Sequence, residues 1–213
     1  AKIGEAEALA AQGVSTGLLI TSPVVSAPAV ARLAALNLAT EGLKVVVDHP
    51  GNVAALGAAA SASGKPLEVL IDLDPGIHRT GVASPQAAVA LFEAIKSEPA
   101  LTYAGLQCYC GVQQHIEAFD VRKTALEDRG AYIREVIDAL TAAGGAPPIV
   151  SGCFRATIQS LMASASSSRT SLATISGAAL GARWRRQTWR SPAASGVTSR
   201  TMPLEKCAST TIC

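Results

Sequence analysis

Two carboxylates, an imidazole and a guanidinium follow one another closely at Asp72, Asp74, His78 and Arg79. They begin inside the apolar run 67–73, which is typical of a buried parallel strand that reaches its polar end. In a chain of alternating strands and helices, the carboxyl ends of the strands are where loops bring reactive groups together on a rigid scaffold. These charged and proton-exchanging groups therefore favour a functional site. The alternative is a solvated loop whose arginine pairs with a neighbouring acid, with the two aspartates only accepting hydrogen bonds from loop amides.

The elements that would position these groups alternate along the chain. Each return to a parallel neighbour needs a crossover helix, so this alternation predicts a parallel sheet, either in a (β/α)₈ barrel or in a doubly wound α/β fold. Five strands are expected, which are too few to close a barrel alone. The expected strands are 43–47, 67–74, 101–109 and 149–150, preceded by a strand and its turn within 17–25. The expected helices are 1–14, 29–39, 52–62, 86–96 and 120–143.

Charge is unevenly distributed along the 213 residues. Residues 1–150 hold 10 Lys/Arg and 15 Asp/Glu, whereas residues 151–213 hold 8 Lys/Arg and the single acid Glu205. The basic balance belongs to the tail and gives no reason to expect a nucleic-acid partner for the folded part. We find no signal peptide and no apolar run long enough to span a bilayer, so we expect no membrane partner. Five cysteines without a C-x-x-C pattern indicate free thiols and a cytoplasmic protein.

Residues 153–213 differ in composition from the rest of the chain, with many Ser, Thr, Ala and Arg and almost no acids. A disordered basic tail fits the charge but not the scattered Trp184 and Trp189. An RNA-binding tail would combine Arg with aromatic residues, but the aromatics here are few and unpatterned. The third interpretation is a segment that was never selected to fold. We therefore divide the chain into 1–152 and 153–213.

Four segments carry a resemblance to a known family: K-I-G-E-A-E-A-L-A-A-Q-G-V, V-V-V-D-H-P-G-N-V, D-L-D-P-G-I-H-R-T-G-V and G-L-Q-C-Y-C-G-V-Q-Q-H. They resemble the D-threonine aldolase and D-serine dehydratase family, which are pyridoxal-phosphate enzymes with an alanine-racemase type of N-terminal barrel. The resemblance covers about residues 1–152. It implies an incomplete (β/α)₈ TIM-type barrel, followed here by a non-native C-terminal tail. The implied function is that of a fragment of a pyridoxal-phosphate-dependent lyase acting on D-3-hydroxy amino acids. The alternative is a non-catalytic pyridoxal-phosphate carrier protein of the same barrel type.

The resemblance also implies roles for single residues. Arg79 matches the arginine of an R-x-G loop that reaches the ring hydroxyl of the cofactor, and Tyr109 matches a tyrosine beside the pyridine ring. Ser151 and Gly152 match the start of a glycine-rich loop whose backbone N–H groups hold the cofactor phosphate. His115 matches a substrate-side group and is the expected catalytic residue.

Other expectations concern groups that this chain lacks. The cofactor lysine of the family lies upstream of the matched span, and Lys2 is not that residue, so this chain alone is expected to be inactive. The resemblance places a divalent metal only in a C-terminal domain, and we expect no metal site in this chain. The expected substrate is a small D-amino acid. For the intact protein of which this chain would be a fragment, a homodimer of the family type remains an open alternative.

Two cysteines and two histidines receive simpler interpretations. Strand alternation places Gln107 and Tyr109 on one face, so Cys108 and Cys110 are expected to be buried thiols on the other, with metal binding as the alternative. His49 and His78 are interpreted as local hydrogen-bonding residues rather than catalytic groups.

The family pattern stops at Cys153, inside the expected phosphate loop. Acids vanish at the same point while Ser and Arg rise. We therefore hypothesise that residues from about Cys153 onward are an out-of-frame translation, against the alternative of a divergent tail.

Overall fold

The computed structural model describes residues 1–152, and the tail interpretations lie outside the described residues. Five strands form one sheet in which every strand pairs in parallel with its neighbour in the chain. This confirms the expected α/β fold with an incomplete barrel. The strands, in sheet order, are β1 (Leu19–Ile20), β2 (Lys44–Val47), β3 (Leu67–Leu73), β4 (Leu101–Cys108) and β5 (Ile149–Gly152).

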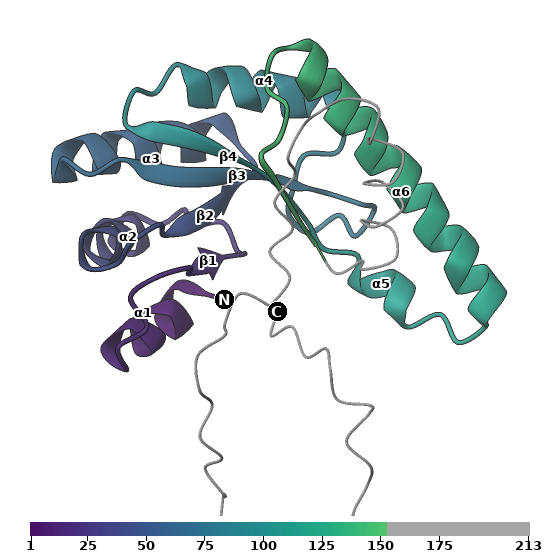
Figure 1. Cartoon of the computed structure of the whole chain (residues 1–213), viewed down its shortest axis with the longest axis horizontal. Coiled ribbons are helices and arrows are strands. Elements are labelled where there is room, and N and C mark those ends of the chain that lie inside the picture. Colours follow the sequence, from purple (N-terminus) through teal and green to yellow (C-terminus); the bar gives the residue numbers. More distant parts are fainter. Residues whose placement is uncertain (153–213) are drawn as a thin grey trace, which may run out of the picture. The chain divides into compact units, whose positions relative to one another are not determined.

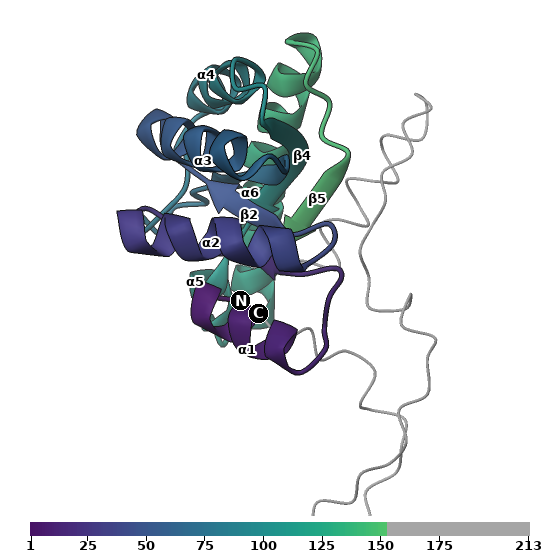
Figure 2. The same cartoon turned by 90° about the vertical axis from the view of Figure 1, so that its left-hand side faces the viewer.

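The helices decide between the two parallel folds that the sequence left open. Figure 1 shows α1 to α4 and α6 along one side of the strands, and Figure 2 shows α2, α3 and α4 stacked on that side. A doubly wound sheet would carry helices on both faces, so the arrangement is that of a barrel segment. The helices are α1 (Ile3–Ala11), α2 (Ala27–Ala39), α3 (Pro50–Ser63), α4 (Pro85–Lys96), α5 (Gly111–Gln114) and α6 (Phe119–Ala142).

Local capping fixes where two of the site-flanking helices begin. The Ser84 hydroxyl accepts a hydrogen bond of 3.1 Å from the Ala87 N–H at the start of α4. A ring nitrogen of His49 accepts one of 3.0 Å from the Gly51 N–H, so α3 begins two residues earlier than the expected position 52. The capping role confirms that His49 is a local hydrogen-bonding residue.

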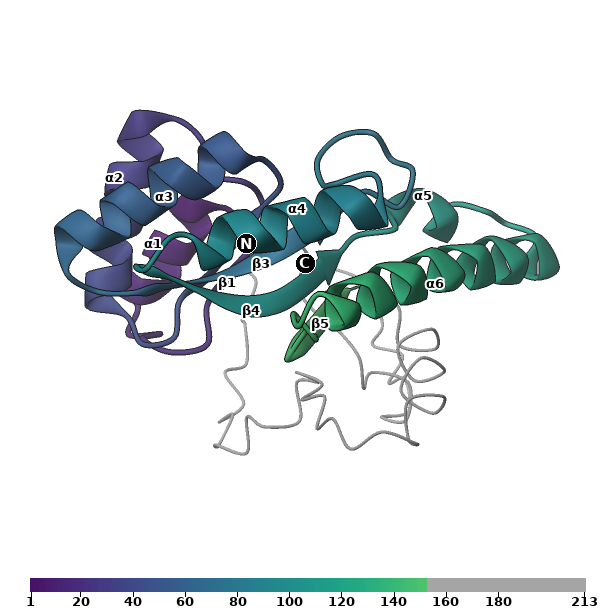
Figure 3. The ribbon, with the colours of Figure 1, turned by 90° about the horizontal axis from the view of Figure 1, so that it is seen from above.

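Two expected elements differ from the structure. β1 has only two residues, so the strand within the expected strand and turn 17–25 is shorter than its apolar run indicates. Helical spacing within 120–143 predicts an apolar stripe made up of Val121, Leu126, Ile133, Val136, Ile137 and Leu140. This prediction is wrong at Val121, which is 58% exposed. Figure 3 shows that the first turns of α6 extend beyond the sheet and therefore have no strand to cover. Ile133 and Leu140, farther along α6, are buried as expected.

The two faces of the sheet have separate apolar clusters. Alternate strand residues such as Val69, Ile71 and Leu106 pack against the helices in the main core. The residues between them point to the opposite face, which we call the concave face. Its buried apolar cluster consists of Val46, Leu70 and Ala104, with Leu19 and Ile149 packed against it.

A β-bulge interrupts the pairing of β3 with β4. Val69 pairs with Tyr103, but the next residue, Leu70, pairs with Gly105, so Ala104 is the extra residue on β4. Gly105 has φ +131°, and a Cβ there would collide with the main chain of Ile149 on β5. Glycine is therefore required where the bulge meets β5.

Candidate functional site

A small pocket lies where the carboxyl ends of β1, β3 and β4 meet. It receives side chains from three strand ends and from residues 74–82, which we call the anchored loop. A larger hollow on the helix side, between α3 and residues 98–100, is lined mainly by Ala, Gly and Pro and carries no comparable polar cluster. The residues that line the small pocket are Thr21, Asp72, Leu73, Pro75, Ile77, Arg79, Thr80 and Tyr109.

Asp74 holds the first half of the anchored loop. Its Oδ1 accepts backbone hydrogen bonds from Gly76 and Ile77, both 2.8 Å, and from His78 at 3.0 Å. Burial alone would raise the pKa of Asp74, but these three bonds outweigh it and the pKa is lowered. The expectation that this acid binds loop amides is confirmed.

Two further acids hold the second half of the loop. The Thr80 hydroxyl donates to Asp72 Oδ2 at 2.9 Å, and the Gly81 N–H donates to Asp48 Oδ2 at 3.1 Å. Burial raises the pKa of Asp72 to about 6, against the opposing effect of the Thr80 hydrogen bond, and the charge of Asp48 raises it further. Asp72 thus accepts from a side-chain hydroxyl, and it is the acid here that can gain a proton near neutral pH.

Helix α6 fixes both ends of the same loop. Arg129 Nη1 donates to the carbonyl oxygen of Pro75 at 2.9 Å, and the Tyr132 hydroxyl donates to that of Val82 at 3.1 Å. Burial raises the pKa of Tyr132 to about 12, so the phenol keeps its proton and remains a donor. The loop is therefore bound to strand ends on one side and to a helix on the other.

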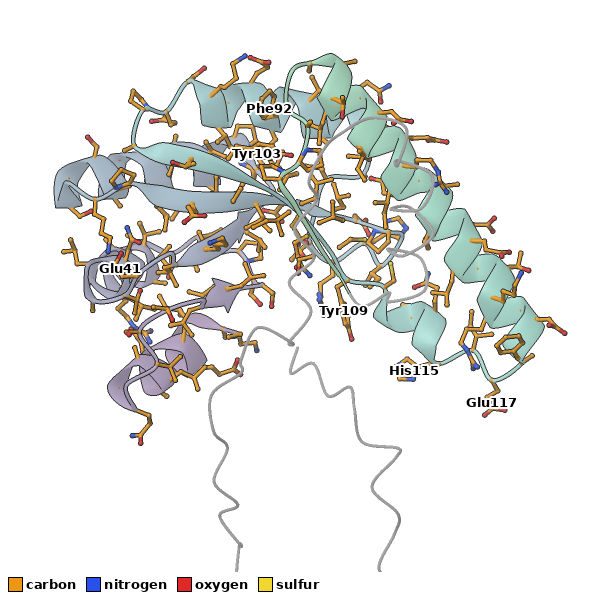
Figure 4. All side chains as sticks on the ribbon, in the orientation of Figure 1. Glu41, Phe92, Tyr103, Tyr109, His115 and Glu117 are labelled. Atoms are coloured by element: carbon orange, nitrogen blue, oxygen red, sulfur yellow. The ribbon has the colours of Figure 1, made fainter. Side chains whose placement is uncertain are left out.

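The anchored loop presents Arg79 to an aromatic ring. The Arg79 guanidinium lies over the Tyr109 ring, 5.5 Å from its centroid, and remains exposed. Figure 4 shows Tyr109 projecting beyond the end of β4. His78, at φ +56°, places its Nδ1 3.1 Å from Asp74 Oδ2, which fits its interpretation as a local hydrogen-bonding residue. The result is an accessible cation beside an aromatic surface.

A row of polar residues crosses the concave face at the strand ends. Asp72 pairs in register with Gln107, and Gln107 pairs with Ser151. Gln107 is 6% exposed, and its Oε1 has no hydrogen-bond partner among residues 1–152. Gln107 and Thr80 were not assigned roles from the sequence. The alternation that links Gln107 to Tyr109 was the available signal for the first, and nothing in the sequence marked Thr80.

The residues expected from the family resemblance are not all at one place. Arg79 and Tyr109 share the pocket. Ser151 and Gly152 end β5 on the same edge of the sheet, half-buried and outside the pocket lining. His115 is exposed at the end of α5, away from that lining, as Figure 4 shows.

Cys108 and Cys110 belong to the helix-side core, with their sulfur atoms 3.7 Å apart. Both are buried free thiols, as the sequence predicts. Within residues 1–152 no three His, Cys, Asp or Glu side chains are grouped in a way that could hold a metal ion. In the same part of the chain, none of the helices has the length and apolar character needed to cross a membrane.

Curated relatives are similar to a large part of this chain, but they are much longer proteins. A 3-hydroxy-D-aspartate aldolase of Paracoccus denitrificans (strain Pd 1222) is 38% identical over 151 residues, which are 71% of this chain and 39% of that protein. A D-threonine aldolase of Arthrobacter sp is 30% identical over 121 residues, 57% of this chain and 31% of that protein. The chain thus spans less than two fifths of the length of these two relatives.

Solved structures agree with the fold. The D-threonine aldolase from Filomicrobium marinum matches with a TM-score of 0.68 and 33% identity, over 71% of this chain and 41% of that one. The D-threo-3-hydroxyaspartate dehydratase from Delftia sp. HT23 matches with a TM-score of 0.64 and 23% identity, over 71% of this chain and 40% of that one. At that identity the second match supports the fold alone.

The family model described as "Alanine racemase, N-terminal domain" matches residues 1–170. This match, with the aldolase relatives, confirms the resemblance noted in the sequence. The matched residues include the parallel barrel segment and the polar strand ends. The chain belongs to the alanine racemase N-terminal domain family.

Proposed function

We propose that residues 1–152 form the pyridoxal-phosphate-binding face of a lyase that cleaves D-3-hydroxy amino acids. The observation that carries the proposal is the Arg79 guanidinium held over Tyr109 at the strand ends. The aldolase names of the relatives at 30% identity or more favour retro-aldol cleavage over dehydration. The whole activity is proposed, since the chain spans only part of the length of these relatives.

The residues present fit a flat, anionic aromatic cofactor. Arg79 offers an exposed cation, and Tyr109 offers a half-buried ring beside it. Gln107 adds a buried polar side chain at the same strand ends. A ligand with a ring, a phenolic oxygen and a phosphate matches this set of charges and surfaces. When bound, pyridoxal phosphate withdraws electrons from the bond that breaks next to the substrate Cα.

Each residue of the chain has one proposed task. Arg79 binds the ring oxygen and keeps it anionic, and Tyr109 packs beside the ring and limits its tilt. The backbone N–H groups at Ser151 and Gly152, at the end of β5, would hold the phosphate. His115 is the proposed catalytic residue on the substrate side, with an exposed imidazole at the end of α5.

Other parts of the proposal concern the protein beyond this face. A divalent metal that binds the substrate hydroxyl would use ligands outside residues 1–152. We propose a cytoplasmic location, because buried free thiols suit a reducing compartment. A homodimer is proposed for the intact enzyme on the family resemblance.

Cofactor binding tests the site directly. The affinity of the 213-residue chain for pyridoxal phosphate is measured by equilibrium dialysis for the wild type, Arg79→Ala and Arg32→Ala. Arg32 is a matched control, because its ion pair with Glu7 lies on α1 and α2, away from the pocket. Loss of a charge-assisted hydrogen bond should weaken binding by about tenfold or more in Arg79→Ala only. Equal affinities in all three proteins would remove Arg79 from the site.

The reaction is tested on the full-length gene product. D-Threonine should yield glycine and acetaldehyde, 3-hydroxy-D-aspartate should yield glycine and glyoxylate, and D-serine tests dehydration to pyruvate. Cleavage of either 3-hydroxy substrate supports the lyase. Cofactor binding without any turnover would favour the non-catalytic carrier, and absence of both would contradict the proposal.

A further inference from the structure

Two buried polar side chains face each other on the concave face. Asp72 of β3 and Gln107 of β4 are direct register partners, and they are 5% and 6% exposed. Neighbouring parallel strands lie about 4.8 Å apart, so side chains in register on one face are within reach of each other. No apolar side chain separates them in the register.

Gln107 Oε1 needs a donor. A buried acceptor without a partner destabilises the fold, and no group among residues 1–152 donates a hydrogen bond to Oε1. The side chain of Cys108 points to the helix-side core and cannot supply one. A protonated Asp72 carboxyl would be an O–H donor in the same row. The Ser151 hydroxyl, in register on the other side, is the second donor within reach.

Burial and the surrounding charges together make the Asp72 carboxyl easier to protonate than an exposed one. Asp48 at the end of β2 and Asp74 in the loop are the acidic groups near it, and Arg79 is the cation. The neutral Cys108 thiol lies on the other face of the sheet, in the helix-side core. Burial is the largest effect, and it raises the pKa of Asp72 to about 6 against the opposing Thr80 hydrogen bond. Both states of the carboxyl are therefore populated between about pH 5 and pH 7.

We propose that Asp72 is a positioning residue for Arg79, and that its neutral carboxyl donates a hydrogen bond to Gln107 Oε1. When Asp72 is ionised, its carboxylate accepts from Thr80 and attracts the neighbouring guanidinium of Arg79 toward the strand end. The only covalent change is the transfer of one proton between the carboxyl and solvent. The link to cofactor binding rests on the proposed function, whereas the pairing with Gln107 does not.

The pairing predicts a pKa change of definite sign. The Asp72 carboxyl of the full chain is titrated by ¹³C NMR in the wild type, Gln107→Met, Thr80→Val and Ser151→Ala. Removal of the acceptor destabilises the neutral acid, so Gln107→Met should lower the pKa of Asp72 by about 0.5 to 1 pH unit. Methionine is less polar than glutamine and by itself would raise the pKa, so a fall identifies a lost acceptor.

The other variants separate the alternatives. Thr80→Val removes a donor to the ionised form and should raise the pKa of Asp72. Ser151→Ala should leave it unchanged. An unchanged or raised pKa in Gln107→Met would overturn the pairing. So would a rise in Ser151→Ala, because it would show that the serine occupies Gln107 Oε1 in the wild type and that Asp72 donates to this oxygen only after the serine is removed.

The positioning role is tested by the pH dependence of ligand affinity. The ratio of the pyridoxal phosphate affinities of the wild type and Asp72→Asn is measured at pH 5 and pH 7.5, which cancels the titration of the ligand itself. The ratio should be near one at pH 5 and should favour the wild type several-fold at pH 7.5. The same affinity ratio at both pH values, or tighter binding by Asp72→Asn than by the wild type, would overturn the positioning role. If neither the wild type nor Asp72→Asn binds pyridoxal phosphate while the pKa pattern holds, the proposed function and the positioning role are both overturned. The pairing of Asp72 with Gln107 then stands.

Discussion

The hydroxyl of Tyr132 donates a hydrogen bond of 3.1 Å to the carbonyl oxygen of Val82, at the end of the loop that presents Arg79. Tyr132 lies in the middle of α6, 50 residues away along the chain. The helix that follows β4 therefore holds a loop that follows β3. Because Arg129 of the same helix binds Pro75, both ends of the loop depend on α6.

Tyr132→Phe should therefore destabilise the protein, and Tyr103→Phe is its matched control. Tyr132→Phe leaves the Val82 carbonyl without this donor and should lower the free energy of unfolding by about 1 kcal/mol. The Tyr103 hydroxyl is buried and has no partner among the described residues, so Tyr103→Phe should be neutral or stabilising. Urea denaturation at pH 7 measures both variants. Equal destabilisation would show that the Val82 bond contributes nothing specific.

Asp74→Asn should destabilise the protein in a pH-dependent way. The pKa of Asp74 is lowered in the folded state, so its stabilising contribution is complete above the unfolded-state pKa near 3.8 and is lost as the pH falls through the folded value. Loss of the charge that accepts three N–H groups should cost about 1–3 kcal/mol at pH 7. The difference from the wild type should shrink at pH 3, and the exposed Asp128→Asn should show neither effect. A constant difference across this range would contradict the assignment.

A comparison of Gly105→Ala with Gly64→Ala separates the destabilisation caused by a positive φ from that caused by a steric collision of the new Cβ. Both glycines have positive φ, but a Cβ at Gly64 meets nothing within 4 Å, whereas one at Gly105 would enter the main chain of Ile149. Gly64→Ala should cost about 1 kcal/mol. Gly105→Ala should cost considerably more and should loosen β5. Hydrogen exchange at the Val150 amide, compared between the two variants, measures that loosening. Similar protection in both would argue against a close approach at Gly105.

The thiols of Cys108 and Cys110 should be unreactive in the folded protein. The pKa of Cys108 is raised by its hydrogen bond with Cys110 and by burial, which keeps it in the unreactive thiol form. A variant with Cys153, Cys207 and Cys213 replaced by Ser isolates this pair. Dithionitrobenzoate should label neither thiol until guanidinium unfolds the protein, and then it should label both. Rapid labelling of the folded variant would contradict the buried arrangement.

The composition change at Cys153 predicts a property of the encoding DNA. If residues from about Cys153 onward are out of frame, the neighbouring frame should encode a glycine-rich loop with a threonine, followed by an acidic segment. Sequencing the gene decides the matter. Early stop codons in that frame would support a divergent tail instead.

Alternation of strands and helices was sufficient to predict the parallel sheet, the five strands and most helix positions, because crossover helices leave a strong pattern. The pattern could not predict that β1 would be so short or that Val121 would be exposed. Both depend on which neighbours the folded sheet offers, and a local sequence window does not contain that information.

The site was predicted unevenly for a related reason. Arg79 and Tyr109 stand in recognisable sequence patterns, and the structure brings them together. Gln107 and Thr80 matter because of Asp72. Asp72 is the register partner of Gln107 on the neighbouring strand, and it accepts a hydrogen bond from the Thr80 hydroxyl. Such pairings depend on strand register and loop closure, which become visible only in three dimensions.

The extra residue at Ala104 reverses the alternation of β4. Tyr103, before it, packs against Phe92 on the helix side, where Figure 4 labels both residues. Their ring centroids are 5.0 Å apart. If the same residues formed a regular strand without the bulge, odd-numbered positions would stay on that side, and Gln107 and Tyr109 would face the helices. Deleting Ala104 should therefore leave Gln107 and Tyr109 on the concave face, because Tyr103 and Gly105 would then pair without an extra residue between them. Inserting one residue after Gly105 should instead move both side chains to the helix side and remove the aromatic partner of Arg79. A one-residue insertion beyond the bulge would thus be more damaging to the site than most substitutions within it.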